Sequence, residues 1–162
     1  MARYKSRVAN DAGGEGDLSR GRLVFQRTCA QCHKLFDAGG DVGPDLTGSD
    51  RANIDYILEN VLDPGASVGR DYQLTNVATT DGRLLSGIVR EQTPDALVLQ
   101  TPNDRLVIPR EDVEELKPSG ESMMPEGLFE KLSDGEFVDL VRYLGSKSQV
   151  RLPVEPEGKR GG

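Results

Sequence analysis

The sequence has little material for a large apolar core. Of its 162 residues, 36% are apolar and 5% aromatic, and tryptophan is absent. No apolar run approaches the ~20 residues that a membrane-spanning helix needs, so the sequence predicts no membrane span. A bound apolar cofactor would supply buried surface that the side chains lack. The length allows one domain, or one domain with a small insertion.

An excess of positive charge is also missing. The sequence has 20 Lys and Arg against 27 Asp and Glu, which gives a formal net charge of −7. Surfaces that bind nucleic acid are usually rich in basic residues, so we expect no nucleic-acid partner. Charge of this size affects solubility and the steering of a partner rather than the fold.

Cysteine and histidine are scarce, and all of them lie together. The two cysteines, Cys29 and Cys32, and the single histidine, His33, form one Cys-x-x-Cys-His motif. This motif is typical of c-type haem attachment, in which each sulfur adds to a vinyl group and the adjacent imidazole reaches the iron. The sequence therefore predicts one covalent haem c with His33 as an axial ligand.

Three other interpretations of the motif are weaker. A disulfide between the two cysteines would close a very small ring and add little stability. A thioredoxin-like dithiol needs a neighbouring βαβ pattern, which the sequence does not show. A zinc site needs a fourth ligand, and without a further Cys or His only a carboxylate could provide it.

The sixth iron ligand of an electron carrier is usually a methionine, because His/Met ligation raises the reduction potential. Beyond Met1 the sequence offers only Met123 and Met124. Pro125 restrains the residue before it to an extended conformation, which favours Met124 as the ligand and leaves Met123 as the alternative. Both methionines could instead fill space in the core.

Hydrophobic periodicity predicts helices on both sides of a strand-rich segment, and hence an α+β fold. Apolar residues at helical spacing indicate helices over 19–28, 53–62 and 134–144. Between them, runs rich in Val, Leu, Ile and Thr are separated by turn residues, which is typical of an antiparallel meander. The expected strands are 72–80, 83–90, 96–101, 105–109 and 113–117.

The two ends of the sequence favour irregular structure. Residues 1–17 lack the apolar segment of a signal peptide, and the glycine-rich run 11–17 favours a flexible lead-in. Residues 148–162 are rich in Pro, Gly and charge, so we expect a disordered tail.

These motifs together resemble the monohaem class I cytochromes c. The resemblance covers 19–65 and 120–146 and rests on Gly21, Phe25, Cys29, Cys32, His33, Gly43, Pro44, Asp45, Leu46, Met124, Pro125 and Tyr143. It implies a mostly helical haem shell in which the first and last helices cross, with Gly21 and Phe25 near Tyr143.

The same resemblance implies further contacts to the haem. Phe25, Pro44 and Leu46 would belong to the residues that bind it. The carbonyl of Pro44 would accept a hydrogen bond from the non-ligating ring nitrogen of His33 and so orient the imidazole. In these cytochromes an arginine after the Gly-Pro loop often binds a haem propionate, but Arg51 falls one residue short of that spacing.

A closer resemblance is to the planctomycete and verrucomicrobial type of haem-binding domain. It rests on the segments 42–48, 62–64, 80–83, 108–109 and 124–128. In that family a β segment interrupts the cytochrome fold before the methionine. The resemblance implies a cytochrome c domain at 18–71 and 118–147, interrupted by a small antiparallel β insertion at 72–117. The insertion is also similar to an Sm-like small barrel, whose RNA-binding role fits poorly with an acidic chain.

The function expected from these observations is one-electron transfer, not enzymatic catalysis. Domains of the second type often form the C-terminal part of larger exported proteins resembling sugar dehydrogenases. We therefore expect a redox partner protein or an upstream dehydrogenase domain, and a periplasmic or otherwise extracytoplasmic location. The chain would then be an excised domain or a mature form. The alternatives are a gas sensor or haem enzyme with an open sixth coordination site, and a docking role for the β insertion.

Overall fold

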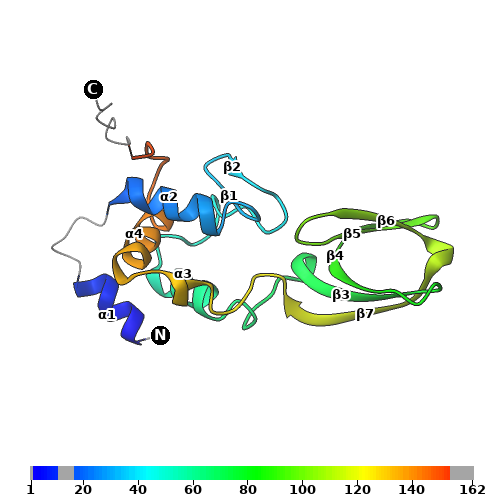
Figure 1. Ribbon diagram of the computed structural model, residues 1–162. Coiled ribbons are helices and arrows are strands. Elements are labelled where there is room, and N and C mark those ends of the chain that lie inside the picture. Colours follow the sequence, from blue (N-terminus) through cyan, green and yellow to red (C-terminus); the bar gives the residue numbers. More distant parts are fainter. Residues whose placement is uncertain (1, 11–16, 154–162) are drawn as a thin grey trace, which may run out of the picture.

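The computed structural model describes residues 2–10 and 17–153 and is an α+β structure. Helices gather at one end and a five-stranded sheet forms the other (Figure 1). The helices of these ranges are α1 (Ala2–Asn10), α2 (Leu18–Thr28), α3 (Ile54–Leu62) and α4 (Asp134–Leu144), with short 3-10 turns at Arg70–Tyr72, Arg110–Asp112 and Leu128–Lys131. None of these helices is long and apolar enough to cross a membrane.

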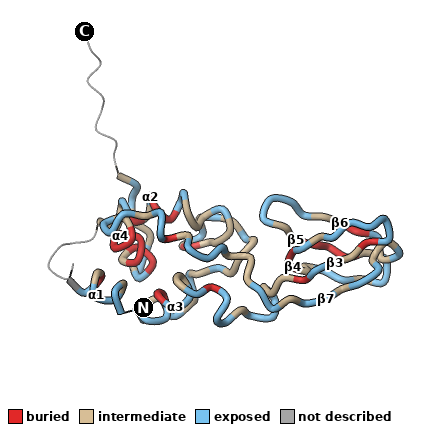
Figure 2. Tube along the Cα trace, turned by 60° about the horizontal axis from the view of Figure 1, so that its bottom comes forward, coloured by how far each residue is buried: buried red, intermediate tan, exposed pale blue. Residues whose placement is uncertain are grey.

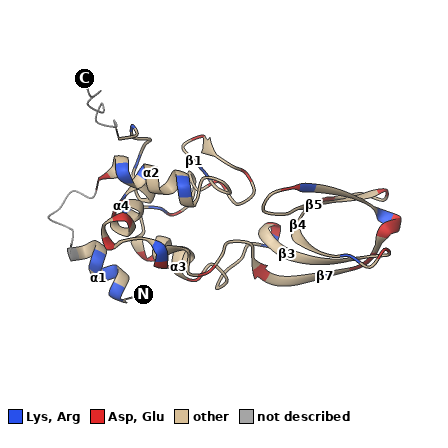
Figure 3. Ribbon diagram, in the orientation of Figure 1, with Lys and Arg blue, Asp and Glu red and all other residues tan. Residues whose placement is uncertain are grey.

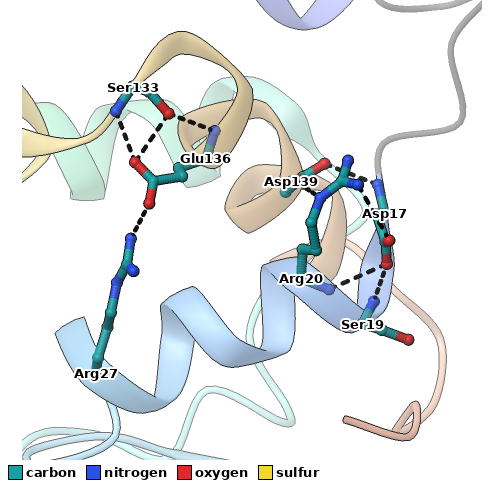
Figure 4. Close-up of polar contacts among 7 residues, drawn as sticks. All are labelled: Asp17, Ser19, Arg20, Arg27, Ser133, Glu136 and Asp139. Carbon is teal, nitrogen blue, oxygen red and sulfur yellow. Dashed lines mark hydrogen bonds and ion pairs between the residues drawn. The ribbon is translucent and has the colours of Figure 1, made fainter. Parts of the chain in front are cut away.

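Polar caps fix the beginnings of the helices, and helices α2, α3 and α4 lie where the periodicity predicts them. The Asp17 side chain accepts hydrogen bonds from the backbone amides of Ser19 and Arg20 and so caps α2 (Figure 4). At α4, Ser133 and Glu136 form a reciprocal capping box. Such caps satisfy backbone donors that have no partner inside the helix.

Helices α2 and α4 cross at Gly21. A Cβ at this position would lie 2.1 Å from the Asp139 carbonyl oxygen and 2.7 Å from the Tyr143 Cβ. One turn later the Phe25 and Tyr143 rings pack with centroids 5.6 Å apart. The helix crossing implied by the resemblance to class I cytochromes is therefore confirmed.

A buried carboxylate ties the two helices together beside this crossing. Asp139 of α4 is 4% exposed. It accepts hydrogen bonds from the backbone amide of Asp17 at 2.7 Å and from the Arg20 Nε at 2.8 Å (Figure 4). A buried carboxylate needs such partners to offset its loss of hydration, so the network holds the start of α2 against α4.

Helix α1 shows that the expected flexible lead-in is wrong for residues 2–10. Its Tyr4 ring packs 5.0 Å from that of Phe137, and Val8 is buried. The Val8 carbonyl accepts a hydrogen bond from Arg142 at 3.2 Å. Tyr4 and Val8 are four residues apart and share one helix face, and this short apolar face is stabilised by α4. Residues 11–16 of the expected lead-in lie outside the described residues.

The expected disordered tail is likewise wrong for residues 148–150. The Tyr143 hydroxyl donates a hydrogen bond to the Gln149 side chain at 2.7 Å, and Arg22 donates to the Val150 carbonyl. Val150 also packs against the helical core. These contacts with α2 and α4 stabilise an ordered conformation of residues 148–150, which composition alone does not predict. Residues 154–162 lie outside the described part of the chain.

The large sheet is antiparallel throughout, with the strand order β6-β5-β4-β3-β7. Its strands are β3 (Gln73–Thr79), β4 (Leu84–Gln92), β5 (Ala96–Gln100), β6 (Arg105–Pro109) and β7 (Val113–Ser122). They match the expected runs, except that β7 continues five residues beyond 117. Pro118 is tolerated in this extension because β7 lies at the edge of the sheet.

Buried residues form two separate groups (Figure 2). One lies among the helices, and the other, inside the sheet, consists of Val77, Leu97, Leu99 and Ile108. Charged residues lie at the outer end of the sheet, around Arg110–Asp112, and on α1 (Figure 3). The small hairpin β1 (Lys34–Leu35) and β2 (Ala38–Gly39) directly follows His33.

Candidate functional site

The Cys-x-x-Cys-His motif forms a tight turn at the end of α2. Cys29 is the C-cap of this helix, and its amide donates to the Phe25 carbonyl at 2.8 Å. The amides of Cys32 and His33 both donate back to the Cys29 carbonyl, at 3.1 and 2.9 Å. Because the chain turns so sharply, all three functional side chains line the same cavity.

This cavity has a volume of about 230 Å³, and most of the expected site residues line it. The helical part contributes one wall, and Tyr72 and Ile88 contribute another from the side of the sheet. The expected site residues among its lining are Cys29, Cys32, His33, Pro44, Leu46, Met123 and Met124. Phe25 is not one of the lining residues: it is buried against Tyr143 and supports the helix crossing instead.

The His33 ring is held by the glycine-rich loop that follows the hairpin. Its Nδ1 lies 3.0 Å from the Pro44 carbonyl oxygen, as the resemblance implies. Because a carbonyl can only accept, Nδ1 carries the proton in this bond, and Nε2 keeps the lone pair that can bind a metal. This contact fixes both the tautomer and the orientation of the imidazole.

Gly43 is required by the close approach of this loop to the imidazole. A Cβ at position 43 would lie 2.6 Å from the His33 Cε1 and 2.8 Å from Nδ1. The Gly43 amide also donates to the Cys32 carbonyl at 2.7 Å. The loop is therefore fastened to the motif on one side and to the ring on the other.

The electrostatics of the two thiols differ from those of a redox dithiol. Burial, together with the neighbouring Cys32, raises the pKa of the Cys29 thiol to about 12. Burial also raises the pKa of Cys32. Reactive dithiols have lowered pKa values, whereas both thiols here are neutral at physiological pH. This argues against the thioredoxin-like interpretation. Within 2–10 and 17–153, no group of three or more His, Cys, Asp and Glu side chains is placed to hold a metal ion.

Arg51 has a structural role that sequence reasoning missed. Its Nη1 donates to the carbonyls of Leu144 and Ser146, both at 2.8 Å, and its Nη2 donates to that of Thr47 at 3.1 Å. The guanidinium also lies 4.8 Å from the centroid of the Phe36 ring. Arg51 thus satisfies carbonyls at the end of α4, which a helix leaves without internal partners. No local sequence signal marks the contact with the end of α4, because the Leu144 and Ser146 carbonyls are more than ninety residues away.

One nitrogen of Arg51, its Nε, takes no part in these hydrogen bonds. It is buried and has no hydrogen-bond partner among the described residues, although Arg51 lines the cavity. Buried donors are rarely left unsatisfied in folded proteins. A cavity lined by two free thiols, a tautomer-fixed imidazole and an arginine with an unsatisfied donor fits haem, which carries vinyl groups, iron and carboxylates.

Comparison with known proteins gives matches in the region of the motif. Residues 16–68 match the family described as cytochrome c oxidase, cbb3-type, subunit III. Over 49 residues the chain is 43% identical to a cytochrome c-553-like protein of Synechocystis sp., a match that covers 30% of this chain and 46% of the relative. These matches support a c-type cytochrome. They imply covalently bound haem c as the cofactor.

The extent of these matches is limited. The chain spans less than half the length of the curated relative it matches. Among solved structures, that of the pleiotropic translational regulator Hfq aligns with 40% of this chain and 88% of its own, at 15% identity and a TM-score of 0.29.

Proposed function

We propose that this chain is a one-electron carrier that holds its haem through Cys29 and Cys32, with His33 and Met124 as the axial ligands. The observation that carries the proposal is that both cysteines, His33 and Met124 line one cavity. Bound haem supplies an iron that takes up and releases one electron. His33 and Met124 would both bind the iron, so neither ligand position would be left open for a substrate.

The chain's own residues set the conditions for this transfer. Pro44 fixes the orientation of the His33 imidazole and raises its basicity as a ligand. Leu46, Ile88 and other apolar residues of the lining exclude water, which also affects the reduction potential. Arg51 lines the cavity and would bind a haem propionate there, while its Nη1 holds the end of α4 and its Nη2 holds the Thr47 carbonyl.

The expected partner and location follow from the same chemistry. An electron carrier needs a donor and an acceptor, and a dehydrogenase, either as an upstream domain or as a separate protein, is the class we propose. Covalent attachment of haem c normally takes place outside the cytoplasm, so we propose a periplasmic or otherwise extracytoplasmic location. The insertion of the sheet into a cytochrome domain at 72–117 is part of this proposal.

The experiment that tests the axial ligands is optical spectroscopy of the protein produced in a host that attaches haem c. We expect the oxidised protein to show the weak far-red sulfur-to-iron band and the reduced protein to ignore CO. The variant Met124→Ala should lose the band, bind CO and have a lower reduction potential, because the thioether that raises the potential is removed.

The matched control is Met123→Ala, which removes the neighbouring methionine of the same cavity. It should keep the band, the potential and the indifference to CO. If the two variants exchange these behaviours, Met123 is the ligand. If wild-type protein lacks the band and binds CO, the iron has an open site, and a gas sensor or haem enzyme replaces the electron carrier.

A further inference from the structure

We infer that Arg90 of strand β4 is a positioning residue for the axial histidine, so that the sheet controls the orientation of the His33 imidazole. The inference rests on the proposed function, since an imidazole orientation matters when His33 binds iron. It assigns to the sheet a role in setting the reduction potential, in addition to covering one side of the cavity.

Arg90 joins the sheet to the loop that holds the imidazole. Its Nη2 donates to the Asp41 carbonyl at 3.0 Å and also to the Val42 carbonyl. Its guanidinium lies 5.4 Å from the centroid of the Tyr72 ring. These contacts connect segments nearly fifty residues apart in the sequence.

The two carbonyls held by Arg90 directly precede the residues that contact the imidazole. Gly43 packs against the His33 ring, and its amide is bonded to the motif. Pro44 then provides the carbonyl that accepts from Nδ1. Gly43 lies so close to the His33 ring that there is little room between them. A shift of the backbone at 41–42 must therefore move Gly43 and, with it, the imidazole ring.

The strand is irregular at the position of Arg90. In the pairing of β4 with β5, Val89 lies opposite Leu99 and Glu91 opposite Val98, so Arg90 is the extra residue of a β-bulge. Bulges redirect a side chain and occur often next to functional sites. The irregularity is an observation independent of the hydrogen bonds, and it lies at the residue whose guanidinium binds the carbonyls of Asp41 and Val42.

The geometry favours arginine over lysine at this position. A guanidinium is planar, stacks on an aromatic ring and presents several donors in a fixed arrangement, whereas an ammonium is a compact point charge on a flexible stem. Arg90 stacks on Tyr72 and binds two successive carbonyls at once. A lysine would keep the charge and most of the apolar stem but could not reproduce this combination.

The test uses the haem-loaded protein and the variants Arg90→Gln and Arg90→Lys. We expect a raised reduction potential for both, because a loosened Pro44–His33 hydrogen bond makes the imidazole a poorer electron donor to iron. The electron paramagnetic resonance g values of the oxidised form should change as the ring turns. Hydrogen exchange at the Gly43 amide should become about tenfold faster as the loop opens locally.

The matched control is Arg83→Gln. Arg83 precedes the same strand but binds the exposed Asp81 at 2.8 Å, away from the cavity. It should leave the potential, the g values and the Gly43 exchange rate unchanged. Wild-type potential and g values in both Arg90 variants overturn the inference, even if loop exchange becomes faster. Should the glutamine variant fail to attach haem, the lysine variant decides alone.

The two proposals fail in different ways. If wild-type protein shows the sulfur-to-iron band and the Arg90 variants match it in potential, the electron carrier stands and the role of Arg90 is wrong. If wild-type protein attaches no haem, both are wrong. If it attaches haem but lacks the band, Met124 ligation is wrong, and the g values still report whether Arg90 orients His33.

Discussion

The helical part and the sheet bury their apolar residues in different ways. Among the helices, buried side chains such as Leu58 and Leu140 belong to a core whose neighbours open onto a cavity of about 230 Å³. In the sheet, Val77, Leu97 and Ile108 pack in a separate cluster. A core with a cavity lacks the contacts that a filled core has. The comparison indicates that the helical part depends on its cofactor for stability, whereas the sheet is complete without it.

The largest expected effect separates the two regions directly. In the double variant Cys29→Ala/Cys32→Ala, haem is no longer covalently held. A ligand that binds only the folded state stabilises that state by on the order of 3 kcal/mol or more when it is present far above its Kd. We therefore expect the helical part of the variant to lose stabilisation of this size. Hydrogen exchange measured by mass spectrometry should become faster in α2, α3 and α4. Strands β3 to β7 should keep wild-type exchange; equal acceleration in both regions contradicts the comparison.

A matched pair of fully buried leucines tests the two cores at similar cost. Leu140 of α4 and Leu97 of β5 are both 0% exposed. Each substitution to alanine should lower the free energy of unfolding by about 2–5 kcal/mol. For Leu140→Ala, chemical denaturation followed by haem absorbance should show this lower free energy of unfolding directly. Leu97→Ala should leave the haem spectrum of the folded protein unchanged and affect the exchange of the strands.

Two glycines allow a smaller version of the same comparison. A Cβ at Gly21 would lie 2.1 Å from the Asp139 carbonyl oxygen, and one at Gly87 would lie 2.5 Å from that of Gln100. Alanine at either position overfills a packed interface, at about 1–3 kcal/mol. The melting temperature, followed by haem absorbance, should be lower in Gly21→Ala than in wild-type protein. In Gly87→Ala the destabilisation should instead appear as faster hydrogen exchange in the strands. If the melting temperature followed by haem absorbance falls as much in Gly87→Ala as in Gly21→Ala, the two cores are not independent.

The smallest expected effect concerns acid stability. The Arg27 side chain, together with the Ser133 backbone and side chain, lowers the pKa of the Glu136 carboxyl from 4.5 to about 2. Because the folded pKa is the lower one, the stability that Glu136 contributes is present above 4.5 and is lost as the pH falls towards 2. Glu136→Gln should therefore flatten the pH dependence of the melting temperature in this window. Asp81→Asn is the counterpart in the sheet, where the Thr79 hydroxyl lowers the pKa of the carboxyl, and its effect should be confined to the strands.

Much of the fold was predictable because its signals are local. The first residues of α2 and α4 follow from the N-cap Asp17 and from the Ser133 capping box, which are recognisable within a few residues of sequence. The strands follow from short β-rich runs and turn residues. The motif residues Cys29, Cys32 and His33 are adjacent in sequence, so their meeting in one cavity needs no knowledge of the fold.

The features that sequence reasoning missed depend on contacts between distant segments. Helix α1 is ordered through Val8 and Tyr4 against α4, more than 130 residues away. Arg51 donates to the Leu144 carbonyl at the end of α4, and Arg90 donates from a β-bulge to the Asp41 carbonyl. Every residue has a backbone carbonyl, so no pattern of residue types in the sequence predicts which carbonyls will be the partners.

The pairing of Gln73 with Ser122 bears on how such a molecule can change over evolution. The chain leaves the helical part at the start of β3 and returns at the end of β7, and these two ends are neighbours in the ladder. Adjacent ends are the condition under which a segment can be exchanged without disturbing its host. If the sheet is an insertion, as proposed, the fifty residues from Gln73 to Ser122 would be a unit that recombination can replace in one step, and a replacement would have to supply the Arg90 contact anew.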